Sequence, residues 1–270
     1  MLYAILLGIL QGITEFLPIS SSGHLVLAQN FMPDFHSPGL VFDVILHAGT
    51  LLAVLAYYCK DIIWIGKGVL KKLPETDNKA ALNLLKMIVI GTIPAAILGV
   101  AAEDLFEQVF EKPIYASFFL IGTGCILFIG EYMARSFAEN ARESGTVKDA
   151  LLVGLAQAMA LFPGISRSGS TMAAGLALGW KREFCARFSF LLMIPAVGGA
   201  VVLKLPDLPQ LLSSGSVSWP VVFTGFISAA LSGYLAIVFL LGLIKKFTFN
   251  VFAVYCMLAG IISVVVLSTS

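Results

Sequence analysis

The sequence carries little charge for its length. Only 12% of its 270 residues are Asp, Glu, Lys or Arg, about half the fraction typical of soluble domains. The net charge is +1, and no basic tail or aromatic-interleaved basic patch is present, which argues against a surface for the backbone of a nucleic acid. In contrast, 59% of the residues are hydrophobic and the mean hydropathy is +0.94. The shortage of charge therefore predicts a polytopic membrane protein, with the bilayer and no nucleic acid as its partner.

Cysteine is also scarce. The four cysteines, Cys59, Cys125, Cys185 and Cys256, are widely separated, with no Cys-x-x-Cys pair and no histidine at metal-ligand spacing. We expect all four to be small apolar packing residues. The N-terminus lacks the basic region and the cleavage signature of a removable signal peptide, so we expect Met1 to begin the mature chain.

Six apolar runs are long enough to cross a bilayer as helices, since the hydrocarbon core is about 30 Å thick and a helix rises about 1.5 Å per residue. They cover residues 40–58, 82–102, 114–132, 188–205, 219–243 and 249–267. Two further pairs of runs are too short to span, namely 2–17 with 25–31 and 149–162 with 172–178. The sequence predicts an all-α integral membrane protein with six transmembrane helices plus two re-entrant helical hairpins.

The basic residues are concentrated in alternate loops. Thirteen of the 17 fall within residues 60–79, 135–148, 181–187 and 245–246, whereas the opposite loops hold acidic residues at 103–111 and 207. Under the positive-inside rule, the basic side is cytoplasmic. The first hairpin then enters the membrane from outside and the second from inside.

The chain contains an internal repeat. A shift of 146 residues aligns residues 8–23 with residues 154–169 without a gap, with seven identities in 16 positions. Each half holds one hairpin followed by three spans, and an odd number of spans inserts the halves in opposite orientations. The sequence thus predicts a single membrane domain, residues 1–270, built as an inverted-topology repeat of about 1–135 and 148–270. In such a plan the two hairpin tips are neighbours near the midplane.

The tip of the second hairpin, residues 163–171, has the composition of an anion site. Arg167 offers a planar fork of donors, and a helix that begins beside it favours negative charge. Phosphate fits because a guanidinium binds it bidentately. The predicted phosphate-binding residues are Arg167 with Ser20, Ser22, Gly164, Ser166, Ser168 and Thr171. The alternative is a polar surface loop in which Arg167 pairs with a lipid headgroup.

The tip of the first hairpin supplies a carboxylate and candidate nucleophiles, which complement the phosphate-binding arginine of the second tip. Gln11 and Glu15 are four residues apart, and Ser21 and His24 three apart, so each pair shares a helix face. Glu15 is the candidate metal ligand or general base, with Gln11 as a neutral co-ligand. The nucleophile stays open between Ser21, His24 and a water held by the metal, and we favour Ser21 because it aligns with Arg167 in the repeat.

Each of these roles has a structural alternative. Glu15 can be a buried carboxylate that only neutralises Arg167, and His24 can be a helix-start histidine bound to a backbone carbonyl. His36 is expected at the surface of a polar loop, and His47 as a packed interior group within a span. Asp43 and Glu131 lie near span ends, where we expect them at the membrane interface.

Two motifs resemble a known family, the bacterial undecaprenyl-diphosphate phosphatases of the bacitracin-resistance type. Residues 11–15 (QGITE) look like the family's Glu/Gln-x-x-x-Glu motif, which residues 16–24 (FLPISSSGH) extend. Residues 163–171 (PGISRSGST) match its Pro-Gly-x-Ser-Arg-Ser-x-x-Thr motif. The resemblance covers essentially the whole chain. Gln11 stands at the first acidic position, which the family allows, and this argues against a mechanism that needs two carboxylates there.

The resemblance implies an enzyme that removes the terminal phosphate of undecaprenyl, or more generally polyprenyl, diphosphate to regenerate the monophosphate carrier for peptidoglycan synthesis. It also implies dependence on a divalent metal (Mg²⁺ or Ca²⁺) and bacitracin resistance on overproduction. The expected location is the bacterial cytoplasmic (inner) membrane, with the active site open to the outer face. The oligomeric state stays open between a monomer and a homodimer.

Other functions fit parts of the same pattern. The main rival is a secondary transporter or flippase of an anionic or phospholipid-like substrate, since inverted repeats and broken helices are common in transporters. A non-catalytic lipid-binding protein is a third class. The unrelated type-2 phosphatidic acid phosphatases share Ser-Gly-His and Ser-Arg fragments, but their Lys-x6-Arg-Pro and later His-x3-Asp motifs are not present.

Overall fold

The computed structural model describes residues 1–32, 39–137, 139–213 and 217–269, and every regular element within them is a helix. His36 lies outside the described residues. Six helices are long and apolar enough to cross a membrane. They are α3 (Leu40–Tyr57), α5 (Glu75–Ala101), α7 (Pro113–Ala134), α10 (Arg182–Lys204), α12 (Trp219–Leu243) and α13 (Asn250–Thr269). The six predicted spans are confirmed as helices of spanning length and composition.

The two short pairs are also helical and are broken where the sequence predicted. The first pair is α1 (Leu2–Phe16) and α2 (Ser21–Asn30), and the second is α8 (Val147–Met159) and α9 (Arg167–Ala177). Positive φ angles mark both breaks, 70° at Ser20 and 100° at Gly164. The longest of these helices, α1, has 15 residues, which gives a length of roughly 22 Å and falls short of a bilayer.

The helices after both breaks begin with the same cap. The Ser20 Oγ accepts the backbone N–H of Gly23 at 3.3 Å, and the Ser166 Oγ accepts that of Gly169 at 3.0 Å. A serine at this position satisfies one of the unpaired amides that begin a helix. The tips also touch, because the Ser168 hydroxyl donates to the backbone carbonyl of Leu17 at 3.2 Å. The prediction that the two tips are neighbours is therefore confirmed.

Short helices outside the spans were not predicted. The segments expected as loops contain α4 (Cys59–Val69) and α6 (Glu103–Phe110), together with α11 (Leu208–Ser213) and the 3₁₀ turns η1 (Arg135–Phe137) and η2 (Leu205–Asp207). Two spans also begin several residues earlier than predicted, at Glu75 and Arg182. Hydropathy locates only the apolar part of a helix, whereas acidic residues in the first turn, such as Glu75 and Asp77, extend a helix into polar surroundings.

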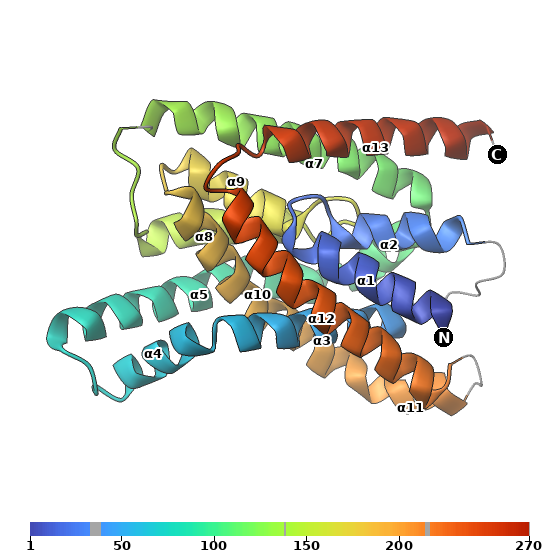
Figure 1. Ribbon diagram of the computed structural model, residues 1–270, viewed down its shortest axis with the longest axis horizontal. Helices are drawn as coiled ribbons and strands as arrows, with labels where there is room; N and C mark the ends of the chain where they lie inside the picture. Colours follow the sequence, from blue (N-terminus) through green and yellow to red (C-terminus); the bar gives the residue numbers. More distant parts are fainter. Residues whose placement is uncertain (33–38, 138, 214–216, 270) are drawn as a thin grey trace.

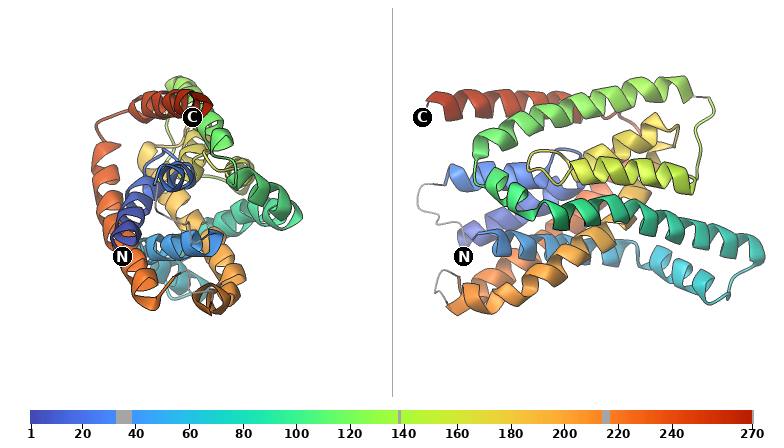
Figure 2. Two further views of the ribbon diagram at one scale, coloured as in Figure 1. Left: turned by 90° about the vertical axis from the view of Figure 1, so that its right-hand side faces the viewer. Right: turned by 180° about the vertical axis from the view of Figure 1, so that it is seen from behind.

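Figure 1 shows how the helices are arranged. The α4–α5 and α7–α8 connections lie at one end of the molecule and both chain termini at the other. Helices α7 and α13 run side by side, as all views in Figures 1 and 2 show. Helix α1 packs on α12, and α8 packs on α5. Each hairpin therefore lies against a long helix from the other half of the chain.

Small residues and aromatic packing hold the hairpins close to these helices. A Cβ on Gly8 would lie 2.5 Å from the Gly225 carbonyl oxygen, and one on Gly154 would lie 2.4 Å from that of Gly91. Only glycine permits backbones to approach so closely. At the end of α1, Phe16 packs edge to face on Phe190 of α10 with ring centroids 5.3 Å apart. This packing fixes the neighbouring residue, Glu15, inside the helix bundle.

Candidate active site

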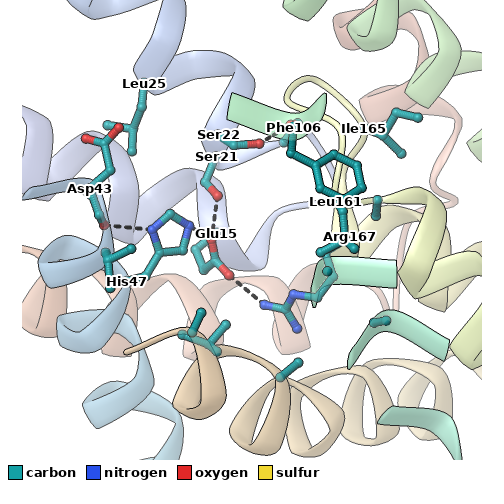
Figure 3. Close-up of a pocket in the computed structure, with 18 of the residues that line it drawn as sticks. Glu15, Ser21, Ser22, Leu25, Asp43, His47, Phe106, Leu161, Ile165 and Arg167 are labelled. Carbon is teal, nitrogen blue, oxygen red and sulfur yellow. Dashed lines mark hydrogen bonds and ion pairs between the residues drawn. The ribbon is translucent and has the colours of Figure 1, made fainter. Parts of the chain in front are cut away.

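A cavity of about 310 Å³ lies where the two broken hairpins meet. Its polar lining includes Glu15 and Ser21 from the first hairpin, Arg167 from the second and His47 from α3. Figure 3 shows these side chains converging on Glu15. Apolar residues of α5, α6 and α10 form the opposite wall. The cavity thus has one polar end and one apolar side, as a site for an amphipathic ligand requires.

An ion pair joins the two tips. The Arg167 Nη2 lies 2.5 Å from the Glu15 Oε1, and the two side chains are only 14% and 5% exposed. The other guanidinium nitrogen, Nη1, donates to the backbone carbonyl of Ser189 at 3.3 Å. Removing one partner of such a buried pair typically costs about 3–5 kcal/mol. The two motifs, 152 residues apart in sequence, are therefore locked together at the cavity.

The second carboxylate oxygen of Glu15 is also occupied. It accepts a short hydrogen bond from the Ser21 hydroxyl and a second, at 2.9 Å, from the Gln11 side-chain amide. Glu15 does more than neutralise Arg167, so the structural alternative for this residue is incomplete. A hydroxyl hydrogen-bonded to a carboxylate is the arrangement in which a base activates a nucleophile. Gln11 is fully buried behind Glu15 and does not line the cavity.

His47 is the main site residue that the sequence analysis missed. Its Nε2 lies 3.5 Å from the Glu15 Oε2, and its Nδ1 is 2.8 Å from the backbone oxygen of Asp43. The carbonyl can only accept, so Nδ1 carries a proton and the ring presents Nε2 to the carboxylate. His47 lies inside the helix bundle, as expected, but it also lines the cavity because α3 lies against α1.

Two acidic residues expected at the membrane interface, Asp43 and Glu131, are buried among the helices. Asp43 is 8% exposed, lines the cavity and accepts the Gln29 side-chain amide at 2.7 Å. Glu131 is 5% exposed and accepts hydrogen bonds from Arg182 Nη2 at 2.5 Å and from the Phe249 backbone amide at 2.6 Å. Partners from distant segments satisfy both carboxylates and permit their burial, and the positions of these residues within the spans did not reveal these partners.

His24 lies apart from the other candidates. Its Nδ1 is 2.7 Å from the Ser20 carbonyl oxygen, and its Nε2 is 2.8 Å from the Tyr255 hydroxyl, with the two rings stacked. It is not among the residues that line the cavity. The geometry matches the structural alternative for this residue, a helix-start histidine bound to a backbone carbonyl.

The predicted phosphate-binding residues divide into two groups. Those that line the cavity are Arg167, Ser20, Ser22, Ser166 and Ser168. Gly164 does not line the cavity. Its carbonyl accepts a hydrogen bond from the hydroxyl of Thr123 at 2.7 Å. Thr171 does not either, and its hydroxyl bonds the Arg167 carbonyl at 2.8 Å and the Ser189 hydroxyl at 2.7 Å. These two residues hold the second tip in place.

A family model described as "Bacitracin resistance protein BacA" matches residues 4–262. The chain belongs to this family. The undecaprenyl-diphosphatase of Methanosphaera stadtmanae is 42% identical over 277 residues, an alignment covering 98% of this chain and 97% of that protein. The undecaprenyl-diphosphatase of Syntrophotalea carbinolica is 43% identical over 261 residues, covering 96% of each chain. That of Thermomicrobium roseum is 41% identical over 277 residues, covering 98% and 97%. The family resemblance inferred from the two motifs is thereby confirmed.

Two more polar residues of this BacA-family chain line the cavity. Gln157, the repeat counterpart of Gln11, is buried and donates from its amide to the Gly91 carbonyl at 3.4 Å. Lys204, in the last turn of α10, adds a positive charge to the lining. Neither belongs to the motifs quoted above. The alignment of the halves marked Gln157, but nothing in the sequence around Lys204 distinguished it from an ordinary residue at the end of a span.

The donor set has few metal ligands of its own. Across residues 1–32, 39–137, 139–213 and 217–269, no three His, Cys, Asp or Glu side chains form a group that could hold a metal ion. Glu15, the acidic member of the ion pair with Arg167, and Asp43 are the carboxylates that line the cavity. The Gln11 Oε1 is buried without a hydrogen-bond partner among these residues. A metal here would need oxygen ligands from the substrate as well as from the chain.

Proposed function

We propose that this chain hydrolyses the terminal phosphate of undecaprenyl diphosphate, releasing undecaprenyl phosphate and inorganic phosphate. This reaction recycles the lipid carrier for peptidoglycan synthesis and explains bacitracin resistance. Membership of the BacA family and the names of its full-length relatives support the substrate. The structural observation that carries the proposal is the convergence of Glu15, Ser21 and Arg167, from two distant motifs, in one cavity.

Arg167 is the phosphate-binding group of the proposed reaction. Its fork of N–H donors suits two oxygens of the terminal phosphate. The hydroxyl of Ser166, which lines the same cavity, adds a donor at the start of α9, while Ser168 holds the tip through its bond to the Leu17 carbonyl. Charge that develops on the phosphate oxygens in the transition state is then met by fixed donors in a buried site. Lys204 adds a second positive charge at the cavity wall.

Ser21 is the favoured nucleophile, with Glu15 as its base. The Ser21 hydroxyl passes its proton to the Glu15 carboxylate as its oxygen bonds to the terminal phosphorus. The bond from that phosphorus to the bridging oxygen breaks, and undecaprenyl phosphate leaves. Glu15 gives this proton to the departing bridging oxygen. As a carboxylate again, it takes a proton from the water that attacks the phosphoserine and returns it to the Ser21 oxygen, which releases inorganic phosphate and restores both residues. His24 and direct attack by water stay the alternatives, and the position of His24 outside the cavity lining favours Ser21 over it.

His47 and Gln11 position the base in this scheme. Both contact the Glu15 Oε2. His47 is itself oriented by the backbone of Asp43. Fixing a carboxylate from two sides keeps its lone pair directed at the hydroxyl that it must deprotonate. We therefore assign both residues to positioning and not to direct contact with phosphorus.

The apolar side of the cavity suits the first part of the prenyl chain. Phe106 and Phe110 of α6, Leu161 beside the second tip, and Val197 and Val201 of α10 line it. A cavity of about 310 Å³ is at the small end for a ligand site. It therefore has room for the diphosphate and the nearest isoprene units, and the rest of the long chain lies in the bilayer.

The proposal includes a divalent cation, Mg²⁺ or Ca²⁺. Glu15 is the residue that would hold it, together with oxygens of the diphosphate, since Mg²⁺ is commonly bound by one carboxylate and substrate phosphates. The fully buried Gln11, with its free side-chain oxygen, fits a supporting role behind Glu15. When bound, the ion would neutralise charge on the phosphates. We also propose that the protein lies in the cytoplasmic membrane of a bacterium and that its active site opens to the outer face of that membrane.

We further propose that α1–α2 and α8–α9 are re-entrant hairpins of an inverted-topology repeat within one membrane domain. The exchanged packing supports this plan, since α1 lies on α12 whereas its counterpart α8 lies on α5. The matching serine caps at Ser20 and Ser166 support it too. Helices α3 and α10 are counterparts and contact each other, as do α7 and α13. A twofold relation between the halves predicts this set of pairs.

Phosphate release by the purified protein tests the function. Undecaprenyl diphosphate in detergent should yield one inorganic phosphate per lipid, and release should stop with a chelator and in Glu15→Gln. Asp61→Asn removes a carboxylate from the Asp61–Arg187 pair outside the cavity and serves as the matched control. Movement of phospholipid across proteoliposomes by a protein that releases no phosphate would instead support the transporter or flippase function.

A further inference from the structure

A second hollow lies at the end of the molecule that carries the basic loops. Its volume is about 460 Å³, and its walls come from the ends of α7, α9, α10, α12 and α13. None of its lining residues lines the candidate active site. In Figure 1 these helix ends lie away from both chain termini. The hollow is therefore a separate feature that the proposed phosphatase reaction does not use.

Positive charge dominates the walls of this hollow. Four basic side chains line it, namely Arg135, Lys181, Arg182 and Lys245. Two acidic side chains, Glu131 and Glu183, also line it. The lining thus has a net charge of +2 in a sequence whose total is +1. Such a concentration of charge selects an anion.

Two of the four basic residues, Arg135 and Lys245, are not neutralised by acidic neighbours among the described residues and can bind an anion. Glu131 is occupied by Arg182 and by the Phe249 amide, as described above. Lys181 lies 2.5 Å from Glu143, and its hydrogen bond and charge lower the pKa of that carboxyl. No ion pair within the described residues involves Arg135 or Lys245. Arg135 instead lies over the Tyr132 ring, 5.9 Å from its centroid.

The ends of two helices add to the anion-binding character of the hollow. Helix α10 begins at the hollow with Lys181 as its N-cap, and no side chain caps its first amides. Helix α13 begins there with Asn250. Both helices place the positive ends of their dipoles at the hollow. The Trp180 ring, 2% exposed, forms part of the wall and can report on what binds there.

We propose that this hollow binds the phosphate group of an anionic lipid headgroup. A free phosphate has the same chemistry, but the rim favours a lipid. Tyr132, beside the hollow, is 72% exposed, and exposed tyrosine is typical of the headgroup level of a membrane. Phe137 and Phe247, 38% and 53% exposed, add apolar surface nearby. Basic pockets between transmembrane helices bind anionic headgroups in this way. Binding would join the ends of α7, α10, α12 and α13 and stabilise the fold.

Two exposed residues of the hollow permit a clean test. The variant Arg135→Gln with Lys245→Gln removes two charges from the wall, whereas Lys148→Gln with Lys246→Gln removes two exposed charges of the same loops that do not line it. Both are made in a Trp64→Phe, Trp219→Phe background, which leaves Trp180 as the single tryptophan of the original three. Equal unfolding midpoints without lipid establish that both variants fold.

The probes are dihexanoylphosphatidylglycerol, dihexanoylphosphatidylcholine and inorganic phosphate, each titrated into protein in a neutral detergent. We expect dihexanoylphosphatidylglycerol to raise the unfolding midpoint and to change Trp180 fluorescence saturably, because a ligand that binds the folded state stabilises it. The apparent Kd should weaken by roughly thirtyfold in the wall variant, about one charge contribution per residue, and stay within about twofold in the control variant.

Three results would overturn the proposal. An equal response to the choline lipid would show that negative charge is not selected. An equal response to inorganic phosphate at the same concentration would assign the site to a free anion and not to a lipid. An unchanged Kd in the wall variant would show that dihexanoylphosphatidylglycerol binds elsewhere. Each outcome is independent of phosphatase activity, so failure of the proposed function leaves this test intact.

Discussion

The two hairpin tips share a backbone plan but carry different chemistry. In each, a serine caps the second helix, and the next residue is Ser21 in the first tip and Arg167 in the second. Both of these side chains reach the Glu15 carboxylate, Ser21 at Oε2 and Arg167 at Oε1. Glu15 itself has no acidic counterpart, because Leu161 occupies its position in the second half. The repeated frame thus places a nucleophile and an anion-binding group on either side of one unique acid.

Removing that unique acid should have the largest effect. In Glu15→Gln the side chain keeps its shape but loses the base, so we expect kcat to fall by roughly a thousandfold, within the range for loss of a general base. Phosphate release under saturating substrate measures it, with Asp61→Asn as the matched control. Near-normal turnover in Glu15→Gln would show that the asymmetry of the tips is not catalytic.

The arginine of the second tip comes next. Arg167→Lys keeps the charge but loses the planar fork, so we expect kcat/KM to fall on the order of a hundredfold, as for removal of one transition-state donor. Arg187→Lys, in a pair of the same 2.5 Å distance outside the cavity, is the control and should stay within about twofold. Equal losses in the two variants would mean that Arg167 acts only through stability.

A smaller effect is expected for the histidine that supports the acid. His47→Ala removes a contact to a buried carboxylate, and loss of a group that orients a functional side chain typically costs about 10–100-fold, so we expect kcat to fall by roughly thirtyfold. His47→Gln keeps a side-chain donor and should recover most of the loss. A fall in both variants, with unchanged unfolding midpoints, would require the imidazole ring itself and give His47 a role beyond positioning.

The paired glutamines give the smallest and most direct comparison of the tips. Gln11 donates to Glu15, whereas Gln157 donates to a backbone carbonyl at the longer distance of 3.4 Å. We expect Gln11→Ala to lower kcat about tenfold and Gln157→Ala to change it less than about twofold. Steady-state kinetics of the two variants decides, and equal effects would mean that the halves contribute alike to the base.

Much of the fold and part of the site could be predicted from the sequence. Length and hydropathy identified all six long helices, and the breaks near Pro18 and Gly164 identified both hairpins. The motifs located Glu15, Ser21 and Arg167. The amphipathic helix α4 was not predicted, because its apolar residues do not form a long continuous run and hydropathy alone detects only such runs.

The rest of the site depends on contacts between distant helices, which one sequence does not reveal. His47 reaches Glu15 because α3 packs against α1, and Thr123 holds the second tip because α7 packs against α9. A lone histidine or threonine inside an apolar span has no local signature of such a role, since either can bond its own helix backbone. The stacking of His24 on Tyr255, a residue of the last helix, was hidden for the same reason.

The most direct test of the central claim is to trap the group that attacks phosphorus. Substrate labelled on its terminal phosphorus is mixed with enzyme and quenched in acid, which preserves phosphoserine and destroys phosphohistidine. We expect acid-stable label on the protein that disappears in Ser21→Ala. Label found only after alkaline quench and lost in His24→Ala would contradict it, as would inversion at a chiral terminal phosphorus, which requires direct attack by water.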